Sequence, residues 1–219
     1  MRAMLSPLLS CLPLKRGATS LWLVTLASTA AATLSGCASP AKEHFYQLSF
    51  AAPVSTAEVA AHAAYDVQID NVRIPEAINR PQLVVQQTAT EALVLEDQRW
   101  IAPIDEQMRQ ALQANLQAQL PHAWVSEHPQ GNMSTTRYRI SLDVRDLRTT
   151  LASEVSMDVV WVIADANKHP LRRQQRRISV PLTDSDYRSI APAISAGLQN
   201  ASLMMADDVR LLAETPQHQ

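Results

Sequence analysis

The sequence predicts an α/β protein with a single two-layer domain, in which a mixed, mostly antiparallel sheet is covered by two long amphipathic helices. Apolar and polar residues alternate with period two in several segments, most clearly from Tyr138 to Arg145. Two longer segments, 104–120 and 190–212, repeat apolar residues every three to four positions, as amphipathic helices do. Neither an internal repeat nor a change of composition divides the chain, which favours one core.

The first 36 residues have the pattern of a signal peptide. Three basic residues precede Leu21–Leu34, a run of 14 residues without a charge. A membrane span needs about 20 apolar residues, so this run fits a signal-peptide core better. It ends at residues 34–37, Leu-Ser-Gly-Cys, which resembles the bacterial lipobox. The resemblance implies removal of residues 1–36 and acylation of Cys37; an ordinary secretory signal and a single-pass anchor are the alternatives.

The expected domain boundaries follow from this processing. Residues 1–36 form the signal peptide, 37–44 a lipidated tether, 45–213 the α/β domain and 214–219 a C-terminal tail. Ala38 stands where many inner-membrane lipoproteins carry Asp, so the resemblance implies a lipid anchor in the outer membrane, with the domain facing the periplasm.

Processing also sets the charge and the thiol content of the mature chain. The removed part carries three of the 19 Lys and Arg and none of the 21 Asp and Glu, which leaves 183 residues with a net charge of −5. This charge argues against a general nucleic-acid partner. Cys11 leaves with the signal peptide and Cys37 carries the acyl chains, so the fold is expected to hold by packing alone.

The first half of the domain predicts four strands and a helix. A first strand is expected over 45–50, followed by a linker or a frayed helix over 51–64. Alternation from residue 65 predicts a half-buried strand, and prolines at 75 and 81 bracket a loop. Strands over 82–88 and 92–96 are joined by a turn at 89–91, and Arg99-Trp100 closes this block.

The helix is expected to contain Pro103 in its first turn and to end before Pro121. Its predicted inward stripe is Ile104, Met108, Ala111, Leu112, Asn115, Leu116 and Leu120.

The second half predicts a short strand, a hairpin and the last helix. The short strand is expected over 123–127 and a turn over 129–132. Strands from residue 138, over 155–163 and over 171–182 follow, with a hairpin turn at 165–168. Residues 183–186 offer helix caps. The last helix should place Ile190, Ile194, Leu198, Ala201, Met205, Val209 and Leu212 inward, with a distortion at Pro192.

Reactive side chains do not form a recognisable catalytic or metal-binding motif. The six histidines stand apart, without the spacing of a metal site, so no metal and no cofactor are expected. Ser195 lies in an amphipathic helix and no nucleophile elbow surrounds it. We therefore expect a protein that is not an enzyme and has no catalytic residue.

A cluster of arginines lies in the predicted strand 171–182. Two interpretations apply to the four residues, which are Arg172, Arg173, Arg176 and Arg177. The first is an edge strand protected by charge against association with other sheets. The second is a contact surface for an anionic lipid headgroup or an acidic partner.

One block of the sequence resembles a known family. It begins with Val67 to Pro75, continues with Ile78 to Val84, which contains Arg80-Pro81-Gln82, and ends with Glu96 to Pro103, which contains Arg99-Trp100. Together with Tyr46-Gln47-Leu48 shortly after the cysteine, this order and spacing resemble the ABC-type transport auxiliary lipoprotein family. The chain departs from the family pattern at Ile78-Asn79 and at Ile101-Ala102, both expected to affect surface detail.

The resemblance implies a non-enzymatic component of an intermembrane lipid transport system. It implies an MCE-domain (mammalian cell entry) partner that reaches from the inner membrane, a lipid cargo and a homo-oligomeric ring. Arg80, Pro81, Arg99 and Trp100 are the residues of the signature surface, although a Trp before a helix also suits core packing. The alternatives are a structural lipoprotein that assists lipopolysaccharide or β-barrel assembly and an envelope hydrolase with an unfamiliar site.

Overall fold

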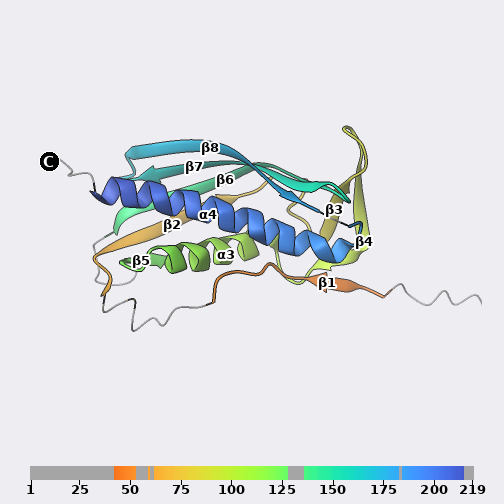
Figure 1. Cartoon of the computed structure of the whole chain (residues 1–219), viewed down its shortest axis with the longest axis horizontal. Helices are drawn as coiled ribbons and strands as arrows, with labels where there is room; N and C mark the ends of the chain where they lie inside the picture. The colour runs from red at the N-terminus through yellow and green to blue at the C-terminus, as the bar shows by residue number, and fades with distance from the viewer. Residues whose placement is uncertain (1–41, 53–58, 60–61, 128–135, 183, 215–219) are drawn as a thin grey trace, which may run out of the picture. The chain divides into compact units, whose positions relative to one another are not determined.

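The computed structural model describes residues 42–52, 59, 62–127, 136–182 and 184–214, which belong to one compact unit (Figure 1). The signal peptide, Cys37 and the turn predicted at 129–132 lie outside the described residues. The strands are β1 (His44–Tyr46), β2 (Tyr65–Arg73), β3 (Gln82–Gln86), β4 (Ala92–Trp100), β5 (Ala123–Ser126), β6 (Thr136–Thr150), β7 (Glu154–Ala164) and β8 (Pro170–Pro181). The long helices are α3 (Ile104–Gln119) and α4 (Ile190–Glu214), and the 3-10 turn η1 (Tyr187–Ser189) precedes α4.

The mixed α/β fold class with two long helices is confirmed, but the strands divide into two sheets where one mostly antiparallel sheet was expected, and three of the six strand pairs in the described residues are parallel. The larger sheet has the order β5-β2-β6-β7-β8, and the smaller sheet has the order β1-β4-β3. Pro75 and Pro81 in the loop after β2 have no N–H to donate to a ladder. The chain therefore leaves the larger sheet after Arg73 and starts a separate hairpin at Gln82.

Both sheets contain parallel and antiparallel strand pairs. The ladders β6–β7, β7–β8 and β3–β4 are antiparallel. The pairs β1–β4, β2–β5 and β2–β6 are parallel. The early strands of the chain thus enter both sheets parallel to strands that come much later in the sequence.

Both long helices pack on the same face of the larger sheet (Figure 1). Helix α4 lies against β7 and β8, while α3 lies against β2 and β5. Ile69, Ile140 and Trp161 point into this layer and are almost fully buried. Each such side chain contributes roughly 1.5–3 kcal/mol by leaving water, so this layer holds the core.

The predicted inward stripe of α3 is confirmed at every position. Its residues from Ile104 to Leu116 are buried, and so is Leu120. Pro103 is the residue before the first turn, with φ −51° and ψ 130°, so the helix begins one residue later than expected. Leu120 ends the helix, and Pro121 follows it.

Helix α4 also follows the predicted pattern. Six of its seven predicted inward residues are buried, and Leu212 is partly buried. The Asp186 carboxylate caps η1 by accepting a hydrogen bond from the Arg188 N–H at 2.9 Å. Pro192 is the third residue of α4, where the missing N–H needs no partner within the helix. Gly197 lets α4 approach the sheet, because a Cβ there would overlap with Met157 Cε.

Several boundaries differ from the sequence prediction. The first strand covers three residues instead of six, because the chain after Tyr46 leaves the sheet. Strands β2 and β6 run further than the alternation indicated, to Arg73 and Thr150. Of the segment 51–64, only residues 51, 52, 59 and 62–64 are described.

The face of the larger sheet opposite the helices is polar. Arg139 of β6 donates from Nε and Nη2 to the two carboxylate oxygens of Asp70 on β2, at 2.9 and 2.6 Å. This bidentate pair stabilises the central parallel strands on the side that the helices do not cover.

Candidate functional site

The smaller sheet brings the two halves of the predicted signature surface together. Arg80 and Pro81 immediately precede β3, while Arg99 and Trp100 end β4. The Trp100 N–H donates to the Pro81 carbonyl oxygen at 2.7 Å. The proline thus shapes the loop so that its carbonyl oxygen faces the end of β4.

Three of the four signature residues line one hollow, which we call the Trp100 hollow. Its volume is about 360 Å³ and its lining residues are Asn79, Arg80, Pro81, Trp100, Ile101, Ala102 and Pro103. Trp100 is only 7% exposed and belongs to the core, so it reaches this hollow as part of the wall. Ile101 is 61% exposed and forms the open side.

Arg99 stands on the other side of β4 from Trp100. It lies opposite Phe45 in the parallel β1–β4 ladder, and its Nη1 forms an ion pair with Glu43 Oε1 at 3.2 Å. The two side chains are 32% and 48% exposed, so water screens the pair and it contributes little to stability. Its effect is local: it ties the first described residues of the chain to the end of β4.

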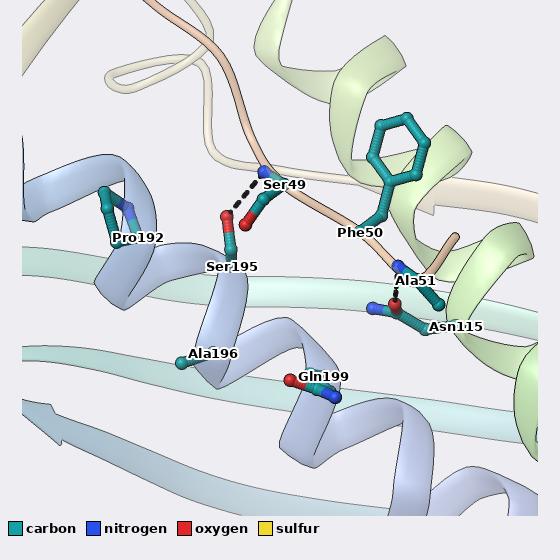
Figure 2. Close-up of a pocket in the computed structure, with 8 residues that line it drawn as sticks. All are labelled: Ser49, Phe50, Ala51, Asn115, Pro192, Ser195, Ala196 and Gln199. Atoms are coloured by element: carbon teal, nitrogen blue, oxygen red, sulfur yellow. Dashed lines mark hydrogen bonds between the residues drawn. The ribbon is translucent and has the colours of Figure 1, made fainter. Parts of the chain in front are cut away.

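A second feature of the site was not predicted from the sequence. Residues 48–51, which we call the strap, leave β1 and cross α4 and α3 (Figure 2). The Ser49 N–H donates to Ser195 Oγ on α4 at 2.9 Å, and the Ala51 N–H donates to Asn115 Oδ1 on α3 at 3.0 Å. A groove of about 230 Å³ lies beside the strap, between the two helices.

Leu48 anchors the start of the strap. Its side chain is 2% exposed, and its N–H donates to Gln107 Oε1 at 2.9 Å. The same Gln107 amide donates to the Ala102 carbonyl oxygen at 2.8 Å. A single buried side chain on α3 therefore holds both the strap and the segment that forms the Trp100 hollow.

The sequence did carry a signal for the strap. Gln107, Asn115 and Ser195 are buried polar residues on otherwise apolar helix faces, and buried polar groups need partners. The prediction placed Asn115 in the stripe without assigning it one. Since backbone N–H groups of another segment are the partners, no side-chain pattern could name them.

Ser195 is occupied by structural hydrogen bonds. Its hydroxyl donates to the Ala191 carbonyl oxygen at 2.7 Å and accepts from the Ser49 N–H. The hydroxyl therefore closes one turn of α4 and holds the strap, which are roles in packing.

The four arginines of β8 lie at an edge of the larger sheet, as one interpretation predicted. They do not form one surface. Arg172 forms an ion pair with Asp208 on α4, and Arg176 donates to the Gln175 carbonyl oxygen. Arg173 and Arg177 alternate with these two residues, so they point to the opposite, polar face.

Three tyrosine hydroxyls have shifted pKa values. Burial raises the pKa of the Tyr46, Tyr65 and Tyr138 hydroxyls. Tyr65 and Tyr138 meet edge to face at 5.7 Å, and the Arg137 guanidinium lies 5.7 and 5.4 Å from the two ring centroids. The edge-to-face rings and the guanidinium pack together at the start of β2 and β6.

The described part of the chain contains neither a metal-site cluster nor a membrane-spanning helix. Within it, no three His, Cys, Asp or Glu side chains gather as a metal site would require. No helix in the same residues has the length and apolar character to cross a bilayer.

Comparison with known sequences identifies similar proteins. The sequence model of a family described as "ABC-type transport auxiliary lipoprotein component" matches residues 46–206. The chain is 23% identical over 192 residues to the intermembrane transport lipoprotein PqiC of Escherichia coli strain K12, covering 87% of this chain and 98% of that protein. The PqiC of Shigella flexneri gives the same identity and coverage.

Solved structures show the same fold. A crystal structure of an uncharacterized protein superposes with a TM-score of 0.65 at 18% identity, over 77% of this chain and 99% of that chain. Protein XCC0632 from Xanthomonas campestris superposes with a TM-score of 0.62 at 11% identity, over 78% of this chain and all of the other.

Proposed function

Because the chain belongs to the family of ABC-type transport auxiliary lipoproteins, we propose that it is a non-enzymatic, outer-membrane-anchored component of an intermembrane lipid transport system. The observation that carries the proposal is the family match over 46–206, which begins nine residues after the lipobox-like Cys37. The name of the PqiC relatives, intermembrane transport lipoprotein, supports the same role.

The proposed anchor is a set of acyl chains on Cys37. The uncharged run before the cysteine suits a cleaved signal peptide, and the residues after it lead directly into β1. Several acyl chains hold a protein far more firmly than one chain does. Ala38 supports the outer membrane as the destination, with the domain in the periplasm.

The proposed partner is an MCE-domain protein that reaches from the inner membrane, with lipid as the cargo. A lipid that crosses the periplasm must keep its apolar surface out of water, at about 25 cal/mol per Å². A shielded route therefore needs a fixed component at the far membrane. A homo-oligomeric ring of anchored subunits would provide such a component.

The anchor is tested in cells with a clickable palmitate analogue and membrane fractionation. We expect the wild-type chain to be labelled and to fractionate with the outer membrane, and C37S to be unlabelled. A38D should be labelled but should move to the inner-membrane fraction. An unlabelled wild-type chain in the soluble fraction would contradict the proposed anchor.

The partner is tested by crosslinking in the envelope followed by affinity purification. We expect an MCE-domain protein among the recovered proteins. Sizing of the purified wild-type lipoprotein in detergent should show a homo-oligomer. Recovery of a β-barrel complex without any transport protein would instead favour a role in outer-membrane assembly.

A further inference from the structure

Two large apolar side chains, one in β1 and one beside it, are strongly exposed. Ile101 is 61% exposed and Phe45 is 56% exposed, the two highest values among the large apolar side chains of the described residues. Leaving such area in water is unfavourable. Their exposure indicates a surface that is covered in the working protein.

The two side chains share one side of the smaller sheet. Phe45 lies directly opposite Arg99 in a parallel ladder, where paired residues point to the same side. Trp100 points to the core, so the chain returns to the side of Phe45 at Ile101. The Ile101 N–H donates to the Tyr46 carbonyl oxygen at 2.9 Å, which keeps this segment against β1.

Cationic side chains border these apolar residues. Arg99 is on the same side as Phe45, where it also pairs with Glu43, and Arg80 lines the Trp100 hollow together with Ile101. Arg80 has no ion-pair partner among the residues that the structure describes. Apolar residues beside arginines suit the boundary between phospholipid headgroups and acyl chains.

The length of the segment between Cys37 and β1 indicates that the bilayer is what covers this surface. Cys37 precedes His44, the first residue of β1, by seven residues. A chain of that length spans at most about 25 Å when fully extended. If Cys37 carries the acyl chains, then β1 and the end of β4 must stay within this distance of the bilayer.

We propose that Phe45 and Ile101, bordered by Arg80 and Arg99, form a bilayer-contact surface that rests on the phospholipid headgroups beside the anchor. This inference rests on the proposed lipidation of Cys37. The proposal also gives the orientation of the domain. β1 and the C-terminal end of β4 face the lipid, and the end of β4 that forms the hairpin with β3 points away from it.

The test uses the full mature lipoprotein bound to vesicles of phosphatidylethanolamine and phosphatidylglycerol. Single-cysteine variants F45C and I101C carry an environment-sensitive fluorophore, and a lipid-borne nitroxide serves as quencher. The matched controls are L93C and L203C, which replace other exposed apolar residues, each 39% exposed. Leu93 lies six residues from Arg99 along β4, roughly 20 Å away.

We expect lipid-borne quenching at positions 45 and 101 to exceed that at 93 and 203 by about twofold or more, because interfacial residues lie within the headgroup region. Equal quenching at all four positions would overturn the contact surface. Protection of positions 45 and 101 that appears only after a partner protein is added would overturn it as well.

A change of the lipid headgroup tests the role of the arginines. Replacing phosphatidylglycerol with phosphatidylcholine should weaken quenching at position 101, and R80Q/R99Q should remove this dependence. R173Q/R177Q on β8 removes the same charge elsewhere and should keep the dependence. If R80Q/R99Q behaves like the control, the arginines are not part of the contact surface.

Flotation of the same vesicles separates this inference from the proposed function. Wild-type protein that fails to float with vesicles overturns the anchor and, with it, the contact surface. Protein that floats while the labels at 45 and 101 remain in water overturns the contact surface alone.

Discussion

At the scale of single residues, Asp208 links three elements of the core. It is 8% exposed and lies on α4, where one carboxylate oxygen accepts from the Trp161 indole N–H at 2.9 Å. The other oxygen forms the ion pair with Arg172 at 2.5 Å. One side chain thus joins α4 to both β7 and β8.

We expect D208A to lower the free energy of unfolding by about 2–3 kcal/mol, because it leaves the indole N–H and a half-buried guanidinium without a partner. D208N should lose less, since its amide oxygen still accepts from Trp161. Urea unfolding measures both.

The control is D207A on the same helix, which removes an exposed carboxylate paired with Arg210. Exposed pairs of this kind contribute about 0.2–1 kcal/mol. If D208A and D207A were equally mild, the proposed role of Asp208 would be wrong.

Asp165 gives a prediction about pH. The His169 backbone N–H donates to its carboxylate at 2.8 Å and lowers the pKa of Asp165 below its ordinary value of 3.8. A lowered pKa in the folded state stabilises the hairpin above pH 3.8. That stabilisation is lost as the pH falls through the lowered pKa.

D165N keeps an oxygen acceptor but cannot titrate. The stability difference between wild type and D165N should therefore be present at neutral pH and should shrink as the solution is acidified below pH 3.8. Thermal unfolding of both proteins across the acid range measures this. A difference that does not change with pH would contradict the assignment.

At the scale of elements, the strap depends on side chains of the two helices. S195A and N115A each remove the acceptor of one strap N–H. A hydrogen bond contributes about 1 kcal/mol, so amide exchange at Ser49 and Ala51 should speed up by about fivefold per lost bond. Amides inside α3 and α4 should keep their protection.

S202A is the matched control for the strap. Ser202 is fully buried on α4, and its hydroxyl donates to the Leu198 carbonyl oxygen of the same helix at 2.8 Å. S202A removes a serine hydroxyl from α4, as S195A does, and should leave amide exchange at Ser49 unchanged. Equal acceleration by S195A and S202A would mean that the strap depends on general helix stability.

The edge strand β8 carries a prediction about association. Arg173 and Arg177 are exposed on the outer strand of the larger sheet, where charge discourages pairing with another edge. R173V/R177V should increase self-association relative to the wild-type protein, as measured by light scattering. R173K/R177K keeps the charge and should behave as the wild type; the same association in both variants would exclude charge as the cause.

The sequence predicts helices and central strands well because their periodic patterns report one buried face. The stripe from Ile104 to Leu120 and the alternation from Tyr138 to Arg145 both reappear as buried faces. The sequence could not show where β1 ends and the strap begins. Residues 45–50 alternate throughout, but only the first of them pair with a neighbouring strand. That pairing depends on β4, more than 50 residues later.

At the scale of the whole molecule, the site was predicted in part. Pro81 and Trp100 were singled out as pieces of one pattern, and the structure joins them by a hydrogen bond. The hollow beside them could not be predicted, because it arises where the small sheet separates from the larger one. That separation depends on which strands pair, which periodicity alone does not determine.

The mature protein should unfold identically with and without a reducing agent. Both cysteines of the chain, Cys11 and Cys37, lie outside the described domain, so no disulfide can cross-link it. Thermal unfolding in the presence and absence of dithiothreitol measures this. A lower midpoint under reducing conditions would show that a disulfide contributes.

The parallel pairing of β2 also has a consequence for the order of folding. β2 lies between β5 and β6, and both are translated only after β3, β4 and α3. A nascent chain therefore cannot complete the central sheet until most of the domain has been synthesised. Such non-local topology slows folding, and under the export proposed above a slow start would leave time for translocation before the core closes.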